Sequence, residues 1–217
     1  MKRSTLANAI CVFLLVAGPV AFADPPQTLP NGLHRIQTNK VTLAYVRPGT
    51  DWTKYKTIFL RKLVVPASAR NAAPSGATPE FGESYLLTDD NVAELQKSFS
   101  DSMHNVLGNA GFTFVTTPRA DTLIVAPEIV KIILNAPIQN TRQSYSGMGF
   151  TVSEGGGAME MAAVLGDGGS NKVVAEVVDR KYGSNMWGLN NSVTNLGEAR
   201  DVFDQWANDL SDRLTSK

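Results

Sequence analysis

The segment "AMEMAAVLGDGGSNKVVAEVVDR", residues 158–180, determines the fold that we expect from this sequence. Its first part, residues 158–167, alternates, so that the side chains in step with Met159 lie opposite those in step with Glu160. The turn-forming letters DGGSN follow, and the β-rich run 172–180 leads back. The pattern predicts a β-hairpin.

Three more β-rich segments precede this hairpin. Residues 56–65 are apolar on both alternating faces, which is typical of a strand in the middle of a sheet. A short strand is expected at 112–117 and a longer one at 121–135. Pro127 restricts the longer one to a sheet edge, a bulge or two shorter strands, because proline lacks the N–H that a ladder uses.

Two amphipathic helices complete the pattern. Thr88, followed by two aspartates, is expected to start the first, because threonine caps helices and negative charge favours their N-termini. The second is expected from about Glu198 to Leu214. Apolar residues recur at steps of three and four in both: Val92, Leu95, Phe99, Met103 and Val106 in the first, and Val202, Phe203, Trp206, Leu210 and Leu214 in the second.

The predicted order of elements is therefore β-α-β-β-β-β-α. It indicates an α+β fold with a mostly antiparallel sheet of about five strands and two helices packed on one face. We assign residues 41–217 to this single domain. Residues 24–40 are rich in Pro, Asn and Gln, and we expect a flexible lead-in there.

The first 23 residues predict export. Lys2 and Arg3 are followed by an apolar run over residues 9–22, and small residues stand just before Asp24. This arrangement is typical of a signal peptide, and the run is too short for a membrane-spanning helix. We expect a periplasmic mature protein that begins at Asp24 and has no transmembrane span.

Cys11 is the single cysteine of the chain, and it lies within this predicted signal peptide. The mature protein would then have no disulfide, thiol nucleophile or thiolate metal site. Ile10 precedes Cys11, and the apolar run lies after it rather than before it. We therefore expect no lipid anchor. The formal net charge of zero also argues against nucleic acid as a partner.

Catalytic signatures are missing from the sequence. The glycine-rich stretch "GMGFTVSEGGG" has no Gly-Lys-Ser/Thr after it, and neither Gly-x-Ser-x-Gly nor Ser-x-x-Lys occurs. His34 and His104 are the two histidines, too few for a His-rich metal site. We expect no cofactor, no metal and no enzymatic activity. An unrecognised pair among the carboxylates remains the hydrolase alternative: Glu128, Glu160, Asp167 and Glu176.

The stretch "YVRPGTDWTKYKTIFL", residues 45–60, could be a binding site or the approach to a strand. Arg47, Pro48 and Gly49 predict a turn. Asp51 is placed to cap one helical turn over residues 52–55. We interpret the motif as structural, with a cap and an aromatic plug at the start of a strand: Asp51, Trp52 and Tyr55.

The loop 181–197 is the better candidate for a contact surface. It combines aromatic rings with amide groups, which suits a glycan strand or an extended peptide: Tyr182, Asn185, Trp187 and Asn190. The structural alternative is that Trp187 covers the end of the core while the asparagines form turns.

Four motifs together resemble a bacterial envelope family known as domain-of-unknown-function family 3313. They are "YVRPGTDWTKYKTIFL", "GNAGFTFV", the predicted hairpin and "FDQWANDLSDRL", and the resemblance extends over roughly residues 40–215. It implies an envelope location and a small periplasmic α+β fold. Many members look lipid-anchored, from which this chain departs. The resemblance brings no catalytic residues, and it favours the structural interpretation of residues 45–60.

Three function classes stay open at this point. The first is a non-enzymatic periplasmic module that docks another envelope protein through a sheet edge or the loop 181–197. The second is a peptidoglycan- or glycan-binding module that uses the same loop. The third is a hydrolase. The sequence does not determine the oligomeric state.

Overall fold

The computed structural model describes residues 24–74, 83–134, 138–140, 151–153, 157–183, 188–190 and 192–216. The predicted signal peptide, residues 1–23, lies outside these ranges. Seven of the strands form one sheet: β1 (His34–Ile36), β2 (Leu43–Val46), β3 (Thr57–Leu60), β5 (Thr113–Phe114), β6 (Thr122–Ile133), β9 (Ala158–Asp167) and β10 (Val173–Tyr182).

The strand order in this sheet is β1-β2-β10-β9-β6-β3-β5. Strands β1 to β6 in that order pair antiparallel, whereas β3 lies parallel to both β6 and β5. The α+β class with two helices is thus confirmed, but the sheet is mixed and has seven strands rather than about five. The prediction of a mostly antiparallel sheet missed the parallel side because parallel partners are joined by long connections that leave no local pattern.

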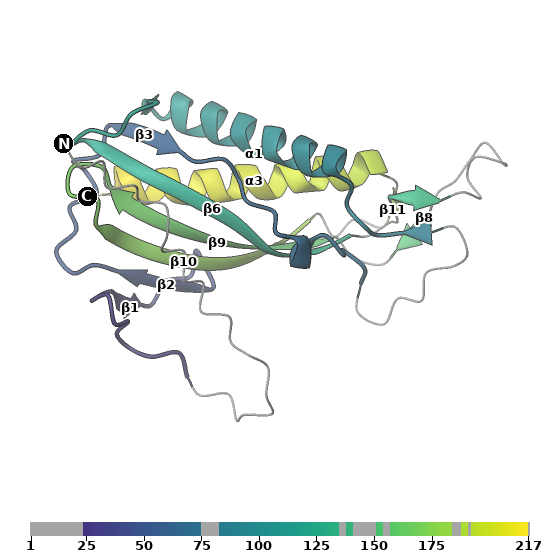
Figure 1. The fold of residues 1–217 in the computed structure, drawn as a ribbon, viewed down its shortest axis with the longest axis horizontal. Coiled ribbons are helices and arrows are strands. Elements are labelled where there is room, and N and C mark those ends of the chain that lie inside the picture. The colour runs from purple at the N-terminus through teal and green to yellow at the C-terminus, as the bar shows by residue number, and fades with distance from the viewer. Residues whose placement is uncertain are drawn as a thin grey trace.

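The hairpin of β9 and β10 occupies the middle of the sheet, as its apolar pattern requires (Figure 1). Strand β9 has the predicted bounds, and Asp179 on β10 lies in register with Met161. A register shift between Val173 and Ala175 starts the returning strand. Both strands present alternate residues to the helices, so their apolar side chains enter the core.

Strand β6 corrects the prediction made from Pro127. It is one continuous strand between β9 and β3, rather than an edge strand or two pieces, and its register shifts only after Ile129. The physical reason lies in β3, which ends at Leu60 after pairing with Val125. Beyond that point only the isolated bridge between Val64 and Glu128 continues the pairing, so the missing N–H of proline interrupts no regular ladder.

Helices α1 (Asp89–Asn109) and α3 (Ser192–Thr215) lie side by side across one face of the sheet (Figure 1). Thr88 caps α1 through a reciprocal pair of bonds with Asn91, in which each side chain accepts from the other residue's backbone N–H. Helix α3 starts six residues before the predicted Glu198. The stripes are confirmed as core surfaces, since every member is buried or partly buried.

Two strands were not predicted at the N-terminal side. Strand β1 lies inside residues 24–40, where we expected a flexible lead-in, and it pairs with β2. Leu33, next to β1, is fully buried. These strands are short and their partner β10 is far away in the sequence, so a local pattern could not reveal them.

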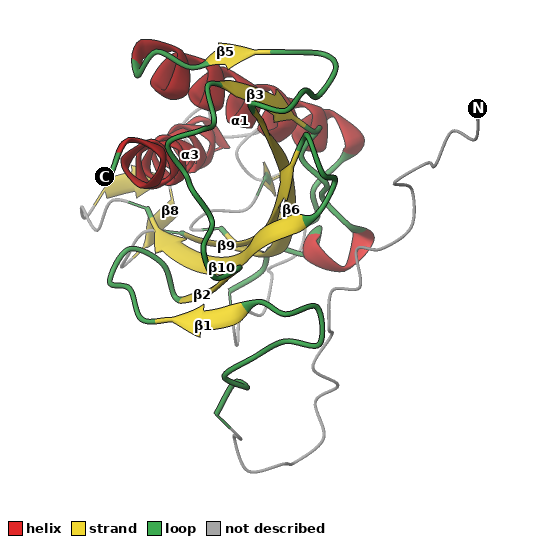
Figure 2. Ribbon diagram, turned by 90° about the vertical axis from the view of Figure 1, so that its left-hand side faces the viewer, coloured by secondary structure: helices red, strands yellow, loops and turns green. Residues whose placement is uncertain are grey.

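Short elements flank the main sheet. They are a 3-10 helix η1 (Ala67–Ala69) and two small antiparallel pairs: β4 (Glu83–Ser84) with β7 (Gln139–Asn140), and β8 (Thr151–Ser153) with β11 (Gly188–Asn190). The larger strands from β3 to β10 form an arc whose concave side faces the helices (Figure 2). This curvature determines where the candidate site lies.

Candidate functional site

A cavity of about 350 Å³ lies between the C-terminal half of α3 and the concave face of the sheet. We call it the α3 cavity. Strands β2, β6, β9 and β10 form its floor, while α1 and α3 cover it. Its lining is mainly aromatic and aliphatic, and includes Trp52, Phe99, Met161, Ala163, Val177 and Leu210.

Strand alternation explains why apolar side chains surround this space. Met161, Ala163 and Leu165 are alternate residues of β9, and all three line the cavity. Ala163 stands opposite Pro127 on β6 and Val177 on β10, which line it too. Since alanine has only a methyl group, it leaves open the volume that a larger residue would fill.

The size and lining match those of small-molecule sites. Such sites enclose roughly 300–1,000 Å³, are mostly apolar, and carry a few placed polar groups. An apolar cavity of about 150 Å³ already takes up benzene. The α3 cavity is more than twice as large, so it can hold a flexible apolar chain.

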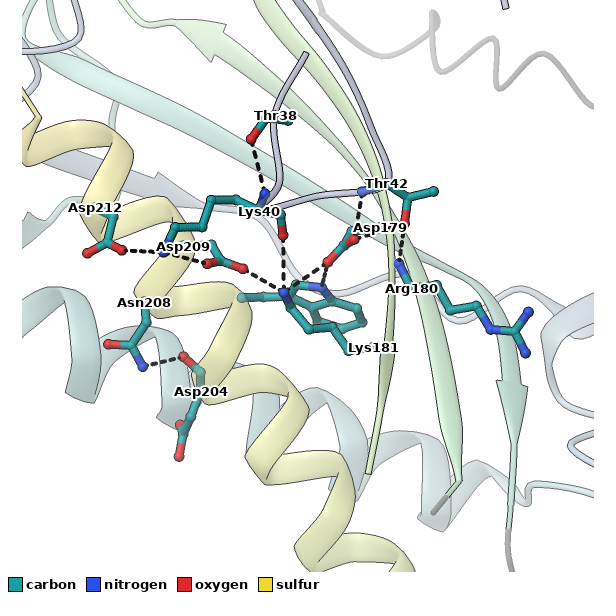
Figure 3. Close-up of polar contacts among 11 residues, drawn as sticks. Thr38, Lys40, Thr42, Asp179, Arg180, Lys181, Asp204, Asn208, Asp209 and Asp212 are labelled. Carbon is teal, nitrogen blue, oxygen red and sulfur yellow. Dashed lines mark hydrogen bonds and ion pairs between the residues drawn. The ribbon is translucent and has the colours of Figure 1, made fainter. Parts of the chain in front are cut away.

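Charged residues surround one side of the cavity and connect the loop between β1 and β2 to α3 (Figure 3). The Nζ atom of Lys40 lies 3.1 Å from a carboxylate oxygen of Asp212 and 3.9 Å from one of Asp209. Lys181 on β10 donates to Asp209 at 2.6 Å. These contacts fix the position of α3 relative to the sheet.

Asp179 is the buried acceptor beneath this rim. It accepts hydrogen bonds from the backbone and hydroxyl of Thr42, at 2.8 and 3.0 Å, and from the indole of Trp206, at 2.9 Å. Lys181 lies 3.2 Å away. Burial by itself lowers the pKa of Lys181, but the bond to Asp209 and the charge of Asp179 outweigh it and raise that pKa. Lys181 is therefore a cation held by two carboxylates.

Trp52 and Arg213 form a second part of the lining. The guanidinium carbon of Arg213 lies 4.9 Å from the centroid of the Trp52 ring, a cation–π geometry. In the described part of the chain, no carboxylate lies within 4 Å of Arg213 and no acceptor pairs with the buried Nε1 of Trp52. A buried donor without a partner costs about 1–3 kcal/mol.

Asp167, at the end of β9, belongs to a separate polar cluster. It forms an ion pair with Lys54 and accepts a hydrogen bond from the hydroxyl of Tyr55 at 3.1 Å and from the backbone and hydroxyl of Ser170. Burial alone raises the pKa of Asp167, but the bonds from Lys54 and Ser170 lower it well below the usual range. Burial, and then the charge of Asp167, raises the pKa of Tyr55.

The first part of residues 45–60 forms a turn that holds the chain beside β10. The N–H of Thr50 donates to the carbonyl of Arg47 at 3.2 Å, and Gly49 has φ of +74°. Pro48 before a positive-φ glycine is typical of a type II turn. The Arg47 side chain donates to the carbonyl of Val173 at 2.8 Å.

The next residues form a second turn instead of the expected helical turn. The N–H of Tyr55 donates to the carbonyl of Trp52 at 3.3 Å. Asp51 accepts from both the backbone and the hydroxyl of Thr53, and these bonds lower the pKa of Asp51. Trp52 and Tyr55 are buried in the core. Trp52 also lines the α3 cavity, a role that we did not predict.

The predicted contact loop 181–197 is only partly described. Tyr182 ends β10 with 57% of its surface exposed, and the guanidinium of Arg180 lies 5.2 Å from its ring centroid. Asn185 and Trp187 lie outside the described residues, and of Asn190 only the backbone, in β11, is described. The importance of this loop for binding stays a prediction.

The carboxylates considered for hydrolysis are divided between different places. Glu128 and Glu160 lie on the sheet face away from the helices, and neither lines the α3 cavity. Glu176 accepts a hydrogen bond from Asn31. Within the described ranges, no group of three or more His, Cys, Asp or Glu residues is arranged to hold a metal ion. What the cavity offers chemically is apolar enclosure with charged groups at its rim.

Sequence reasoning missed most of the cavity-lining residues. Ala163 and Val177 looked like ordinary core positions of the hairpin, and Asp209 and Asp212 like the polar side of a helix. The available signal was the run of small residues at 162–163 in a strand otherwise lined by large ones.

No helix in the described ranges combines the length and apolarity needed to cross a membrane. Among curated proteins, none matches the sequence.

Several solved structures have a similar fold. The PelC dodecamer from Paraburkholderia phytofirmans shares 11% identity, with 75% of this chain and 96% of that chain covered and a TM-score of 0.35. A DUF330 protein from Xanthomonas campestris shares 14% identity over 76% and 87% of the chains, with a TM-score of 0.40. A hypothetical protein from Chlamydia trachomatis shares 11% identity over 75% and 99%, with a TM-score of 0.44.

One family model matches the sequence directly. It describes a protein of unknown function, DUF3313, and the match extends over residues 31–210. These residues run from just before β1 to within the last turns of α3, and the family is the one that the four sequence motifs resemble. Because the match includes most of the chain, this protein belongs to the DUF3313 family.

Proposed function

We propose that this protein is an exported, non-enzymatic binding protein of the bacterial cell envelope, and that it holds an apolar ligand in the α3 cavity. The observation that carries the proposal is the cavity itself, about 350 Å³ of mainly apolar lining beside the core. Protein interiors are normally close-packed, and a space of this size lowers stability unless something occupies it.

Binding is a better use of this site than catalysis. Acid–base chemistry needs a titratable group poised near the operating pH and free to reach a substrate. Here Asp179 and Lys181 are bound to each other and to Asp209. An enclosed apolar surface with paired charges at its rim instead supplies desolvation and orientation, which is what a ligand pocket needs.

Export is supported by the sequence alone. The apolar run 9–22 and the small residues before Asp24 are the features on which it rests. Edman sequencing of the protein recovered from the periplasm should start at Asp24. A different first residue in the periplasmic protein, or a lipid on Cys11, would contradict this part of the proposal.

A sheet edge is a weaker docking surface than we first expected. The two edge strands are β1 with three residues and β5 with two. Such short edges offer few free backbone groups to an added strand. The cavity is therefore the stronger candidate for the site at which this module recognises its partner.

The binding proposal can be tested with N-phenylnaphthylamine, a neutral apolar fluorophore whose emission rises in apolar surroundings. The full mature chain should bind it with saturation. Ala163→Phe places a ring in the middle of the cavity floor and should abolish saturable binding. Ala162→Phe is the matched control, because the neighbouring residue of β9 points to the opposite face of the sheet.

Both variants should first be compared with the parent protein by thermal melting and near-ultraviolet circular dichroism. Retained binding in a folded Ala163→Phe protein, or equal loss in both variants, would show that the fluorophore binds elsewhere. In either case the α3 cavity would lose its assignment.

A further inference from the structure

We propose that the ligand of the α3 cavity is a single-chain carboxylate amphiphile, a free fatty acid, whose chain occupies the cavity and whose carboxylate binds Arg213. This inference rests on the proposed function and specifies its ligand. The structure supports it through the charges at the cavity rim, the polar groups beside Trp52 and the shape of the lining.

The rim charges differ in whether they are already paired. Lys40 lies within ion-pair distance of Asp209 and Asp212, and Lys181 within ion-pair distance of Asp179 and Asp209. Those contacts satisfy the lysines and all three acids.

Arg213 is different. Among the described residues it has no carboxylate partner, although it lines the cavity with its guanidinium over Trp52. A ligand with an anionic end would find its countercharge there.

Trp52 provides a second, independent indication. It is 7% exposed and lines the cavity, yet its buried Nε1–H has no acceptor in the described part of the chain. Buried donors in native proteins are nearly always paired, so an unpaired one indicates a missing partner. A carboxylate held by Arg213 would bring acceptor oxygens next to this indole ring.

A carboxylate suits Arg213 because the planar guanidinium presents two parallel N–H groups to its two oxygens. The remainder of the ligand must be apolar and slender. The floor formed by Ala163, Val177 and Met161 offers no hydrogen-bonding side chain, and the roof presents Phe99 and Leu210. One acyl chain matches this lining, whereas a sugar would lose its hydrogen bonds to water without replacement.

The test compares three ligands that share one chain and differ in the head group: dodecanoate, dodecanol and dodecyltrimethylammonium, each below its critical micelle concentration. Their binding to the mature protein is measured directly by isothermal titration calorimetry and by displacement of N-phenylnaphthylamine. Dodecanoate should bind about tenfold more tightly than dodecanol, as expected for one charge-assisted contact. Dodecyltrimethylammonium should bind most weakly.

Arg213→Gln should remove the preference for dodecanoate over dodecanol while leaving dodecanol affinity unchanged. Arg213→Lys should retain part of it, since a lysine keeps the charge but not the planar fork. Arg180→Gln is the matched control. Arg180 also lies over an aromatic ring, that of Tyr182, but on the strand face opposite to Asp179 and Lys181.

The outcomes separate the two proposals. Equal affinity for dodecanoate and dodecanol, tighter binding of the cation, or a preference that survives Arg213→Gln would overturn the fatty-acid inference and leave a cavity for neutral or cationic ligands. Absence of dodecanoate binding by calorimetry would also overturn it. If N-phenylnaphthylamine fails to bind as well, the proposed function fails with it.

Discussion

The carboxylate of Asp179 on β10 accepts a hydrogen bond of 2.9 Å from the indole Nε1 of Trp206 on α3. Both residues are buried, with 5% and 4% of their surfaces exposed. The bond connects the centre of the sheet to the helix that covers it, beside the α3 cavity. A charged acceptor in the core is stable here because Thr42 and Lys181 supply further donors to it.

Trp206→Ala should lower the free energy of unfolding by about 3–5 kcal/mol, the range for removal of a buried aromatic side chain. Trp206→Phe should cost less, because the ring still packs against Phe203 while only the indole donor is lost. Urea denaturation monitored by far-ultraviolet circular dichroism measures both. A loss below about 1 kcal/mol for the alanine variant would contradict the burial of Trp206.

Stability should also fall in acid because of Asp167. Its pKa in the folded protein is lowered, so its ionised form stabilises the fold above the unfolded aspartate pKa of about 3.9. This contribution is lost as the pH falls toward the lower folded-state value. Asp167→Asn should cost at least about 2 kcal/mol at neutral pH, since it breaks charge-assisted bonds.

The same variant should show a smaller decrease in stability below pH 4 than the parent protein. Urea denaturation at a series of pH values provides the comparison. An acid limb of equal steepness in both proteins would assign the acid sensitivity to other carboxylates.

What could be predicted from the sequence was local. The β9–β10 hairpin and the stripe from Val202 to Leu214 depend on residues close in the chain, so alternation and three- and four-residue steps reveal them. The burial of Trp206 followed from the same stripe and is confirmed.

The rest depends on distant pairings. Strand β2 joins the sheet through β10, about 130 residues later, and β3 pairs in parallel with β6 across the whole of α1. The α3 cavity exists because these pairings curve the sheet away from α3 while Ala163 lies at the centre of the floor. No local period encodes that geometry. Trp52 was correctly singled out by composition, but its place in the cavity depends on Arg213 from the other end of the chain.

Two glycines allow a test of backbone conformation without a packing effect. A Cβ added at Gly49 or at Gly108 would meet no atom within 4 Å. Gly49 has φ of +74°, whereas Gly108 lies within α1. Gly49→Ala should therefore destabilise by about 1 kcal/mol, and Gly108→Ala should stabilise by about 0.5 kcal/mol. Thermal melts that shift in the same direction for both would contradict the turn geometry.

The last prediction compares two lysine–aspartate pairs of nearly equal length and different burial. Lys181 lies 2.6 Å from Asp209, with side chains 15% and 17% exposed. Lys97 lies 2.5 Å from Asp101, with side chains 77% and 49% exposed. Lys181→Met should cost about 3 kcal/mol, because it leaves Asp179 and Asp209 without their shared cation. Lys97→Met should change stability by less than about 0.5 kcal/mol, since water already solvates that pair.

The pH dependence of the Lys181 contribution has the opposite sign to that of Asp167. The pKa of Lys181 is raised in the folded protein, so its stabilisation is complete below the unfolded lysine pKa of about 10.4. It is lost as the pH rises through the folded-state value. The parent protein should therefore lose stability in strong alkali more steeply than Lys181→Met, whereas Lys97→Met should follow the parent. Equal alkaline limbs for the parent and Lys181→Met would show that the cation does not hold α3 against β10, and the rim of the α3 cavity would then need another explanation.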